Sequence, residues 1–251
     1  MTDTLGLIVG SGLVALGLEV TARSPTHTPY GPPSSPVLSA RIGGQRVRCI
    51  ARHGESHGIA PHEVNYRANV WALYQHGVRH LIGVNVVGTI AADFSPGDLA
   101  VPEQLIDYTW GRESTFGGGE HGVVHVEFAE PFSAPLSHEI VAAGRKLGIE
   151  MRRGVYGVTQ GPRLETVAEI DRLERDGCTM VGMTAMPEAA LARELGMDYA
   201  VLAVGVNHAA GRGPAGEGVH AQIERHLRDG MTRVSRILET LVGEKTSSST
   251  L

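Results

Sequence analysis

The hydrophobic positions of this chain form short apolar runs separated by stretches of mixed polarity. Leu5 to Val9 and Leu81 to Val87 are almost wholly apolar, which is typical of strands buried on both faces of a sheet. The first run ends in Gly10-Ser11-Gly12 and the second in Gly88-Thr89. Glycine beside a small hydroxyl residue marks a turn, so each strand is predicted to stop at a polar edge.

Helices are predicted where apolar residues recur three or four positions apart. Pro61 opens one such stretch, in which Val64, Ala68 and Trp71 recur and which Gly77 ends. The remaining pattern predicts helices over 135–147, 166–175, 187–195 and 219–241, strands over 154–159, 179–183 and 199–206, an extended segment over 98–107, and a hairpin of 37–42 with 47–51.

Predicted strands and helices alternate, and no linker rich in proline, serine or charge divides the chain. This favours a single α/β domain over residues 1–245, with a largely buried sheet flanked by helices, and a disordered tail over 246–251. Ligands of open α/β sheets bind beyond the strand ends. The polar residues that end several strands are therefore expected to converge on one site.

Composition narrows the class of protein. The chain has 251 residues, 42% of them apolar, which is enough for a full core without disulfides. Its net charge of −5 gives no basic field that would attract nucleic acid or an anionic membrane. Two cysteines cannot build a disulfide framework, and neither a signal peptide nor a long apolar span is recognisable. We expect a cytoplasmic protein.

The densest polar cluster is the run Arg52-His53-Gly54-Glu55-Ser56-His57, followed by His62. Three histidines suggest a metal site, but Gly54 and Gly58 disfavour the helix that would set their spacing. An arginine beside histidines at a strand end suits an anion better, because guanidinium binds phosphate oxygens in a bidentate fork. A solvated surface loop is the third interpretation.

The glycine turn after the first strand has two interpretations. Gly10-Ser11-Gly12 begins like a dinucleotide fingerprint, but Ala15 stands where the third glycine belongs. It is then either a plain turn or a nest of backbone N–H groups which, with the Ser11 hydroxyl, holds a single phosphate. No nucleophile elbow, P-loop or cysteine–histidine pairing is present, so the sequence has no signature of covalent catalysis.

Three further strand ends have ordinary structural explanations when each is taken alone. Glu165 precedes a helix, where a carboxylate favours the helix dipole. Met183-Thr184 is a strand–helix junction in which Met183 would be core, and Asn207 could be a turn residue.

In combination and in this order, these segments resemble the trimeric purine nucleoside phosphorylase and methylthioadenosine phosphorylase family. Val64 to Leu73 and His125 to Phe132 look most like its methylthio-nucleoside branch, and within it like enzymes acting on S-methyl-5′-thioinosine. The resemblance implies a central mixed sheet and a homotrimer without metal or organic cofactor. It also implies cleavage of a purine nucleoside with inorganic phosphate as co-substrate.

The resemblance assigns a role to twelve residues. Phosphate binding falls to Ser11, Arg52, His53, Asn85, Val86 and Thr184. Nucleoside binding falls to Met183, Ala209, Asn207, Glu165, His220 and His125, with Asn207 and Glu165 also catalytic and His125 reaching in from a neighbouring subunit. Glu55, Val86 and Thr89 depart from the family pattern, and they keep a non-catalytic nucleoside-binding module open as an alternative.

The resemblance also bears on the substrate. Family members acting on 6-aminopurines have Asp at the position of Asn207 and a small hydroxyl residue at that of Glu165, so both residues favour a 6-oxopurine. The 5′ substituent is less settled, because His220 resembles the histidine with which ordinary nucleoside enzymes bind the 5′-hydroxyl. We expect S-methyl-5′-thioinosine to yield hypoxanthine and 5-methylthioribose 1-phosphate, with inosine or guanosine as the alternative.

Overall fold

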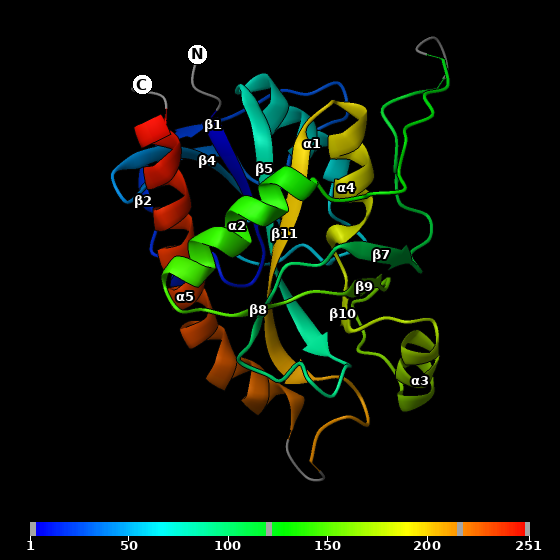
Figure 1. Ribbon diagram of the computed structural model, residues 1–251. Coiled ribbons are helices and arrows are strands. Elements are labelled where there is room, and N and C mark those ends of the chain that lie inside the picture. Colours follow the sequence, from blue (N-terminus) through cyan, green and yellow to red (C-terminus); the bar gives the residue numbers. More distant parts are fainter. Residues whose placement is uncertain (1–3, 119–121, 215–217, 249–251) are drawn as a thin grey trace.

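Helices cover both faces of one mixed β-sheet in the computed structural model of the protein (Figure 1), which describes residues 4–118, 122–214 and 218–248. The strands are β1 (Thr4–Val9), β2 (Glu19–Ser24), β3 (Val37–Ile42), β4 (Gln45–Ala51), β5 (Val78–Thr89), β6 (Leu99–Ala100), β7 (Gln104–Asp107), β8 (Met151–Arg152), β9 (Val155–Val158), β10 (Met180–Gly182) and β11 (Asp198–His208). The helices are α1 (Tyr66–Gln75), α2 (Ala134–Lys146), α3 (Val167–Arg175), α4 (Ala185–Glu194) and α5 (Val219–Ser248), with a 3-10 turn η1 (Val14–Leu16).

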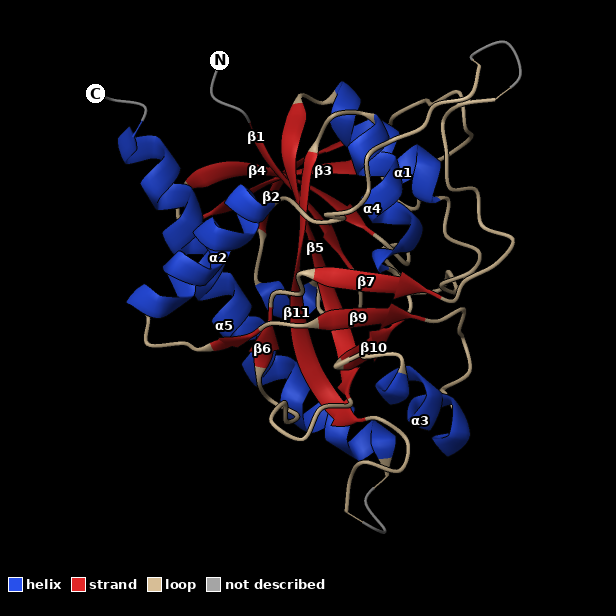
Figure 2. Ribbon diagram, turned by 45° about the vertical axis from the view of Figure 1, so that its right-hand side comes forward, coloured by secondary structure: helices blue, strands red, loops and turns tan. Residues whose placement is uncertain are grey.

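The centre of the sheet is parallel. Strand β1 pairs in parallel with β4 and β5, and β5 pairs in parallel with β11, so these four strands end at the same edge. The main path runs β2-β3-β4-β1-β5-β10-β9-β7, and β10 is antiparallel to β5. Figure 2 shows the long strands β5 and β11 crossing the molecule between the helices. The predicted fold class, an α/β domain with a mixed sheet, is confirmed.

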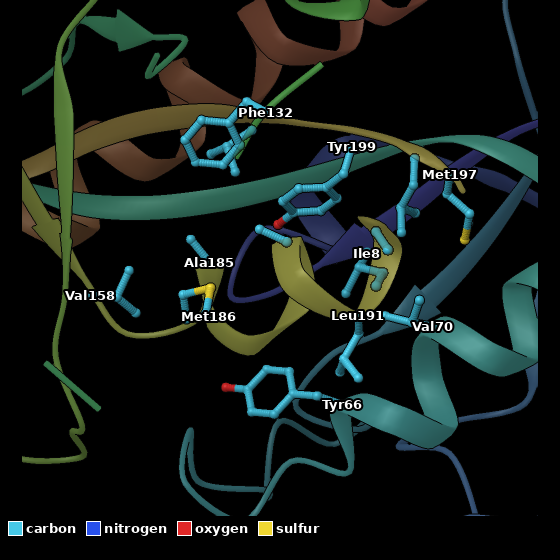
Figure 3. Close-up of a cluster of buried hydrophobic side chains, with 14 of the residues drawn as sticks. Ile8, Tyr66, Val70, Phe132, Val158, Ala185, Met186, Leu191, Met197 and Tyr199 are labelled. Atoms are coloured by element: carbon cyan, nitrogen blue, oxygen red, sulfur yellow. The ribbon is translucent and has the colours of Figure 1, made fainter. Parts of the chain in front are cut away.

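Each face of the sheet has its own apolar core. Helices α2 and α5 lie on one face, over side chains such as Leu7, Ile82 and Leu202. Helices α1 and α4 lie on the other face, where Figure 3 shows Ile8, Met186 and Tyr199 packed together. Successive residues of a strand point to opposite faces, which is why Leu7 and Ile8 belong to different cores.

The structure differs from the sequence predictions mainly at element ends. The helix expected from Pro61 begins at Tyr66, because the Asn65 side chain accepts a hydrogen bond from the Ala68 backbone nitrogen and caps it there. Strand β2, which is largely exposed, was not predicted. Helix α5 extends to Ser248, although 246–251 was expected to be disordered, because adding turns to a formed helix costs little. Residues 249–251 lie outside the described residues.

Candidate active site

A cavity of about 530 Å³ opens where the parallel strands end. Ser11 follows β1, Arg52 follows β4, Val86 lies near the end of β5, and Asn207 lies near the end of β11. These strands are parallel neighbours, so their carboxyl ends meet at one edge, which is where the polar residues were expected to converge.

The cavity brings most of the predicted site residues together. Nine of the twelve line it, namely Ser11, Arg52, His53, Val86, Glu165, Met183, Thr184, Asn207 and Ala209. Three do not, namely Asn85, His125 and His220. Other parts of the wall come from residues that the sequence did not single out, including Ile59, Pro61, Leu164, Val206, Val219 and Ile223.

Arg52 sits at the floor of the cavity in a buried ion pair. Its side chain is 1% exposed and that of Glu188, at the start of α4, is fully buried. The Arg52 Nε and Nη2 atoms donate to the two carboxylate oxygens of Glu188, the latter at 3.0 Å. Tyr199 of β11 donates its hydroxyl to Glu188 Oε2 at 2.9 Å. The fork that was expected to bind phosphate is therefore directed at a carboxylate inside the protein.

Further acceptors surround the same guanidinium group. Nη2 also donates to Asn85 Oδ1 at 2.8 Å and to the Ile8 carbonyl, and Nη1 donates to the Val84 carbonyl at 3.2 Å. Asn85 thus supports Arg52 from behind rather than lining the cavity as predicted, because the pleat turns its side chain away from that of Val86. Nη1 lies next to Gly10, which also lines the cavity.

The charge of Arg52 persists despite its burial. Desolvation alone would lower its pKa, but the adjacent Glu188 carboxylate more than offsets this and the net pKa is raised. Arg52 consequently gives the cavity lining a fixed positive charge, which favours a small anion.

His53 presents a neutral ring to the same end of the cavity. Its Nδ1 donates to the Ile59 carbonyl at 2.8 Å, because a carbonyl can only accept. Burial, and then the positive charge of Arg52, lower the pKa of His53 to about 4. At neutral pH the Nε2 atom is therefore an acceptor, which suits the hydroxyl of a protonated phosphate.

Ser11 and His57 complete this polar end. The Ser11 hydroxyl lies 3.4 Å from His57 Nε2, and the rings of His57 and His53 are 4.9 Å apart. His57 has a φ of 57°, a left-handed conformation that is uncommon for a residue with a side chain. Such conformations concentrate at functional sites.

Asn207 and Glu165 lie at another part of the cavity wall. Between β11 and β5 the pairing shifts from Gly205 opposite Val87 to Asn207 opposite Gly88, so Val206 is an extra residue and the strand bulges. Bulges of this kind re-aim side chains beside active sites. The Asn207 amide nitrogen donates to the His208 carbonyl at 2.8 Å, and the Glu165 carboxylate accepts from the Thr159 hydroxyl at 2.6 Å.

An apolar wall is formed by the start of α5. Val219 and Ile223 are four residues apart on this helix, and both line the cavity. His220 is exposed and does not line the cavity, although it was predicted to bind the nucleoside. The register of the helix directs Val219 rather than His220 inward.

His125 and two of the departures from the family pattern lie away from this cavity. His125 is exposed in the segment between β7 and α2, which extends away from the sheet in Figure 1. Glu55 is exposed and pairs with Arg23, and Thr89 is a buried neighbour of His208. Within the described part of the chain, no three His, Cys, Asp or Glu side chains are grouped so that they could hold a metal ion.

Sequence reasoning missed the partners that hold Arg52. Glu188 lies at the entry to a helix, and Tyr199 lies in an apolar strand. Arg52 and Glu188, which pair in the structure, are 136 residues apart in the sequence. The one available signal was Glu188 itself, a charge among the apolar residues of 185–192. A charge that faces a core must be paired, which points to a buried arginine.

Residues 4–243 match the Phosphorylase superfamily. A protein of Pseudomonas syringae pv. tomato named "Probable S-methyl-5'-thioinosine phosphorylase" is 50% identical over 92% of this chain and 95% of its own. The "6-oxopurine nucleoside phosphorylase" of Pyrococcus furiosus is 41% identical over 82% of this chain and 80% of its own. The methylthioadenosine phosphorylase of Schistosoma mansoni, solved with adenine, superposes with a TM-score of 0.90 at 31% identity, covering 98% of this chain and 92% of that one.

We expect Glu188→Gln to lower the free energy of unfolding by ~3–5 kcal/mol, because it leaves the buried Arg52 charge without a counter-charge. Urea unfolding of the purified variant measures this. Glu103→Gln, which removes an exposed carboxylate paired with Arg153, is the matched control and should cost ~1 kcal/mol or less. Equal losses for the two variants would contradict the assigned importance of the buried pair.

The lowered pKa of His53 predicts a pH dependence of stability. The unfolded state takes up a proton near pH 6.5 and the folded state only near pH 4, so stability falls as the pH drops through this window. One such group contributes a slope of about 1.4 kcal/mol per pH unit. Urea unfolding of His53→Gln from pH 7 to 4.5 should show a shallower decline than the wild type. Parallel curves would show that His53 titrates normally.

Proposed function

The chain belongs to the phosphorylase superfamily, and from this premise we propose that it cleaves S-methyl-5′-thioinosine with inorganic phosphate, giving hypoxanthine and 5-methylthioribose 1-phosphate. The apolar wall made by Val219 and Ile223 is the observation that carries the proposal beyond the family. Phosphate, base and 5′ substituent each correspond to one part of the cavity.

Phosphate is assigned to the end formed by Ser11, Arg52, His53 and Thr184. The buried charge of Arg52 attracts the anion, and the neutral His53 ring accepts from its hydroxyl. Thr184 is the N-cap residue of α4, and its side chain, which makes no capping hydrogen bond but is hydrogen-bonded to Tyr156, lines the cavity. A co-substrate held by fixed dipoles and one fixed charge needs no reorganisation before it reacts.

The purine is assigned to Glu165 and Asn207. A carboxylate at Glu165 accepts from the protonated N1 of a 6-oxopurine, whereas N1 of adenine is itself an acceptor and would face a second acceptor. The Thr159 hydroxyl donates to Glu165 and holds its carboxylate in place. A mismatched base leaves buried polar groups unpaired at ~1–3 kcal/mol each. This supports hypoxanthine as the base released.

The 5′ end of the sugar is assigned to the apolar wall. A methylthio group needs apolar contacts, and Val219 and Ile223 supply them. A 5′-hydroxyl would need a polar partner, and His220, the residue expected to provide one, is exposed outside the cavity. We therefore rank S-methyl-5′-thioinosine above inosine and guanosine.

The reaction follows from this arrangement. The N-glycosidic bond breaks with its electron pair passing to the purine, and a phosphate oxygen bonds to C1′ of the oxocarbenium-like ribosyl group. Asn207 and Glu165 stabilise the electron-rich base as it departs, and Met183 packs against the sugar. Contacts that strengthen only as charge develops lower the barrier itself. No covalent enzyme intermediate is required.

The substrate assignment predicts a clear order of specificity constants. We expect kcat/KM for S-methyl-5′-thioinosine to exceed that for inosine and that for 5′-methylthioadenosine at least tenfold. Ile223→Asn should reduce the preference for the methylthio substrate over inosine, because it places an amide against the methylthio group. His220→Met is the matched control and should leave this preference unchanged. If inosine is preferred and His220→Met reverses that preference, His220 binds the 5′-hydroxyl and the methylthio assignment fails.

The cellular compartment of the protein is inferred from the same premise. We infer a cytoplasmic enzyme, and the buried, unbridged state of Cys49 and Cys178 suits a reducing compartment. None of the described helices is long and apolar enough to cross a membrane. The net charge of −5 favours small-molecule substrates over nucleic acid.

We also propose a homotrimer in which subunits share their active sites. His125 is exposed and outside the cavity of its own subunit, and its neighbours Val123 and Val124 are 78% and 48% exposed. Apolar residues gathered in this way mark contact surfaces.

Light scattering of the purified protein should therefore give the mass of three chains. His125→Ala should raise KM for the nucleoside, and Val123→Asp should weaken assembly and activity together, because a charge would be buried at the contact. A fully active monomer would contradict the proposal.

A further inference from the structure

Arg112 is a half-buried arginine beside the cavity but not in its lining. Its Nη1 atom donates to the carbonyls of Met183 at 2.8 Å and Met186 at 2.7 Å. Its Nη2 atom donates to the Gln160 carbonyl at 2.9 Å, and its Nε donates to the Gln160 side chain at 3.3 Å. The planar fork of an arginine is the side chain suited to binding several acceptors in fixed directions.

These acceptors belong to two segments that lie side by side next to the cavity, because they follow the paired strands β9 and β10. Met183 and Thr184 line the cavity, and Met186 follows them at the start of α4. In the neighbouring segment, Arg112 Nη2 lies 3.4 Å from the carbonyl of Thr159, whose hydroxyl donates to the Glu165 carboxylate. Arg112 thus bonds directly to Met183, the neighbour of Thr184 in the chain, and reaches Glu165 through Thr159.

A third segment joins through Tyr66 of α1. Arg112 Nη1 lies 3.2 Å from the Tyr66 hydroxyl, and the guanidinium carbon is 5.3 Å from the centre of its ring. The same hydroxyl donates to the carbonyl of Pro61, which lines the cavity near His57. Figure 3 shows Tyr66 extending from α1, with its hydroxyl on the side where Met186 and Val158 lie.

The segment that carries Arg112 also forms hydrogen bonds to the last residue of α4. The Glu194 carboxylate, at the last residue of this helix, accepts from the backbone nitrogens of Phe116 and Gly117 and from the Thr115 hydroxyl. Residues 112–117 therefore fix α4 at its first and last turns. The position of Thr184, just ahead of the helix, depends on this attachment.

We propose that Arg112 is a positioning residue that holds the sugar- and phosphate-binding side of the cavity at a fixed distance from Glu165 on the base-binding side. The proposal rests on the proposed function, because it uses the roles assigned there to Met183, Thr184 and Glu165. Phosphate and nucleoside must meet in one geometry for C1′ to be captured, and a displacement of about 1 Å can cost about 100-fold in rate. Arg112 acts through the wall segments and touches no substrate.

The test compares Arg112→Ala with Arg79→Ala. Arg79 is a matched control, because its Nη1 also donates to two backbone carbonyls and its guanidinium lies 4.0 Å from the Tyr74 ring, but at the start of β5, far from the cavity edge. Each variant is assayed for kcat, for KM of phosphate and of nucleoside, and for melting temperature. Each is assayed again with millimolar guanidinium chloride, which is too dilute to denature.

We expect Arg112→Ala to lower kcat at least tenfold while KM for phosphate changes less than threefold, and we expect added guanidinium to restore part of the lost kcat. Arg79→Ala should keep kcat within twofold of the wild type and should not respond to guanidinium. An unchanged kcat in Arg112→Ala, or a loss that follows the melting temperature without recovery, would overturn the proposal. A wild type that cleaves no purine nucleoside would overturn the proposed function as well, and the wild-type assay, run first, separates the two failures.

Discussion

A guanidinium–carboxylate pair buried between the end of β4 and the start of α4 constrains the whole active site. Removing two charges from water is costly, and the cost is met only if every remaining donor and acceptor is satisfied. The structure supplies these partners from three strands, through the carbonyls of Ile8 and Val84, the amide of Asn85 and the hydroxyl of Tyr199. The sheet and α4 therefore cannot shift relative to each other without breaking this network.

The same constraint decides what the cavity can bind. Because Arg52 is engaged with Glu188, it offers the cavity a fixed charge rather than an open fork. Specific recognition of an anion must then come from neighbouring dipoles and from the neutral acceptor of His53. The apolar wall of α5 lies across the same space. A ligand that is anionic at one end and apolar at another matches this distribution of groups.

Wall segments from distant parts of the chain reach the cavity as loops, and loops need external support to keep a geometry. Bonds to backbone carbonyls provide it here, from Arg112 to the 159–160 and 183–186 segments. Glu165 and Asn207 are positioned by comparable devices, namely the Thr159 hydroxyl and the bulge in β11. The precision of the site thus resides in residues that the ligand never touches.

The fold class, and the nine of the twelve assigned residues that line the cavity, could be predicted from the sequence. Apolar runs ending in small polar residues are local signals, and parallel strands bring their ends together wherever such runs occur. Three features depend on contacts between distant segments: Asn85 faces Arg52 rather than the cavity, Val219 rather than His220 turns inward, and Glu188 neutralises Arg52. The direction of a side chain depends on strand pleat, on bulges and on helix register, and a shift of one residue reverses it without changing the pattern from which the element was predicted.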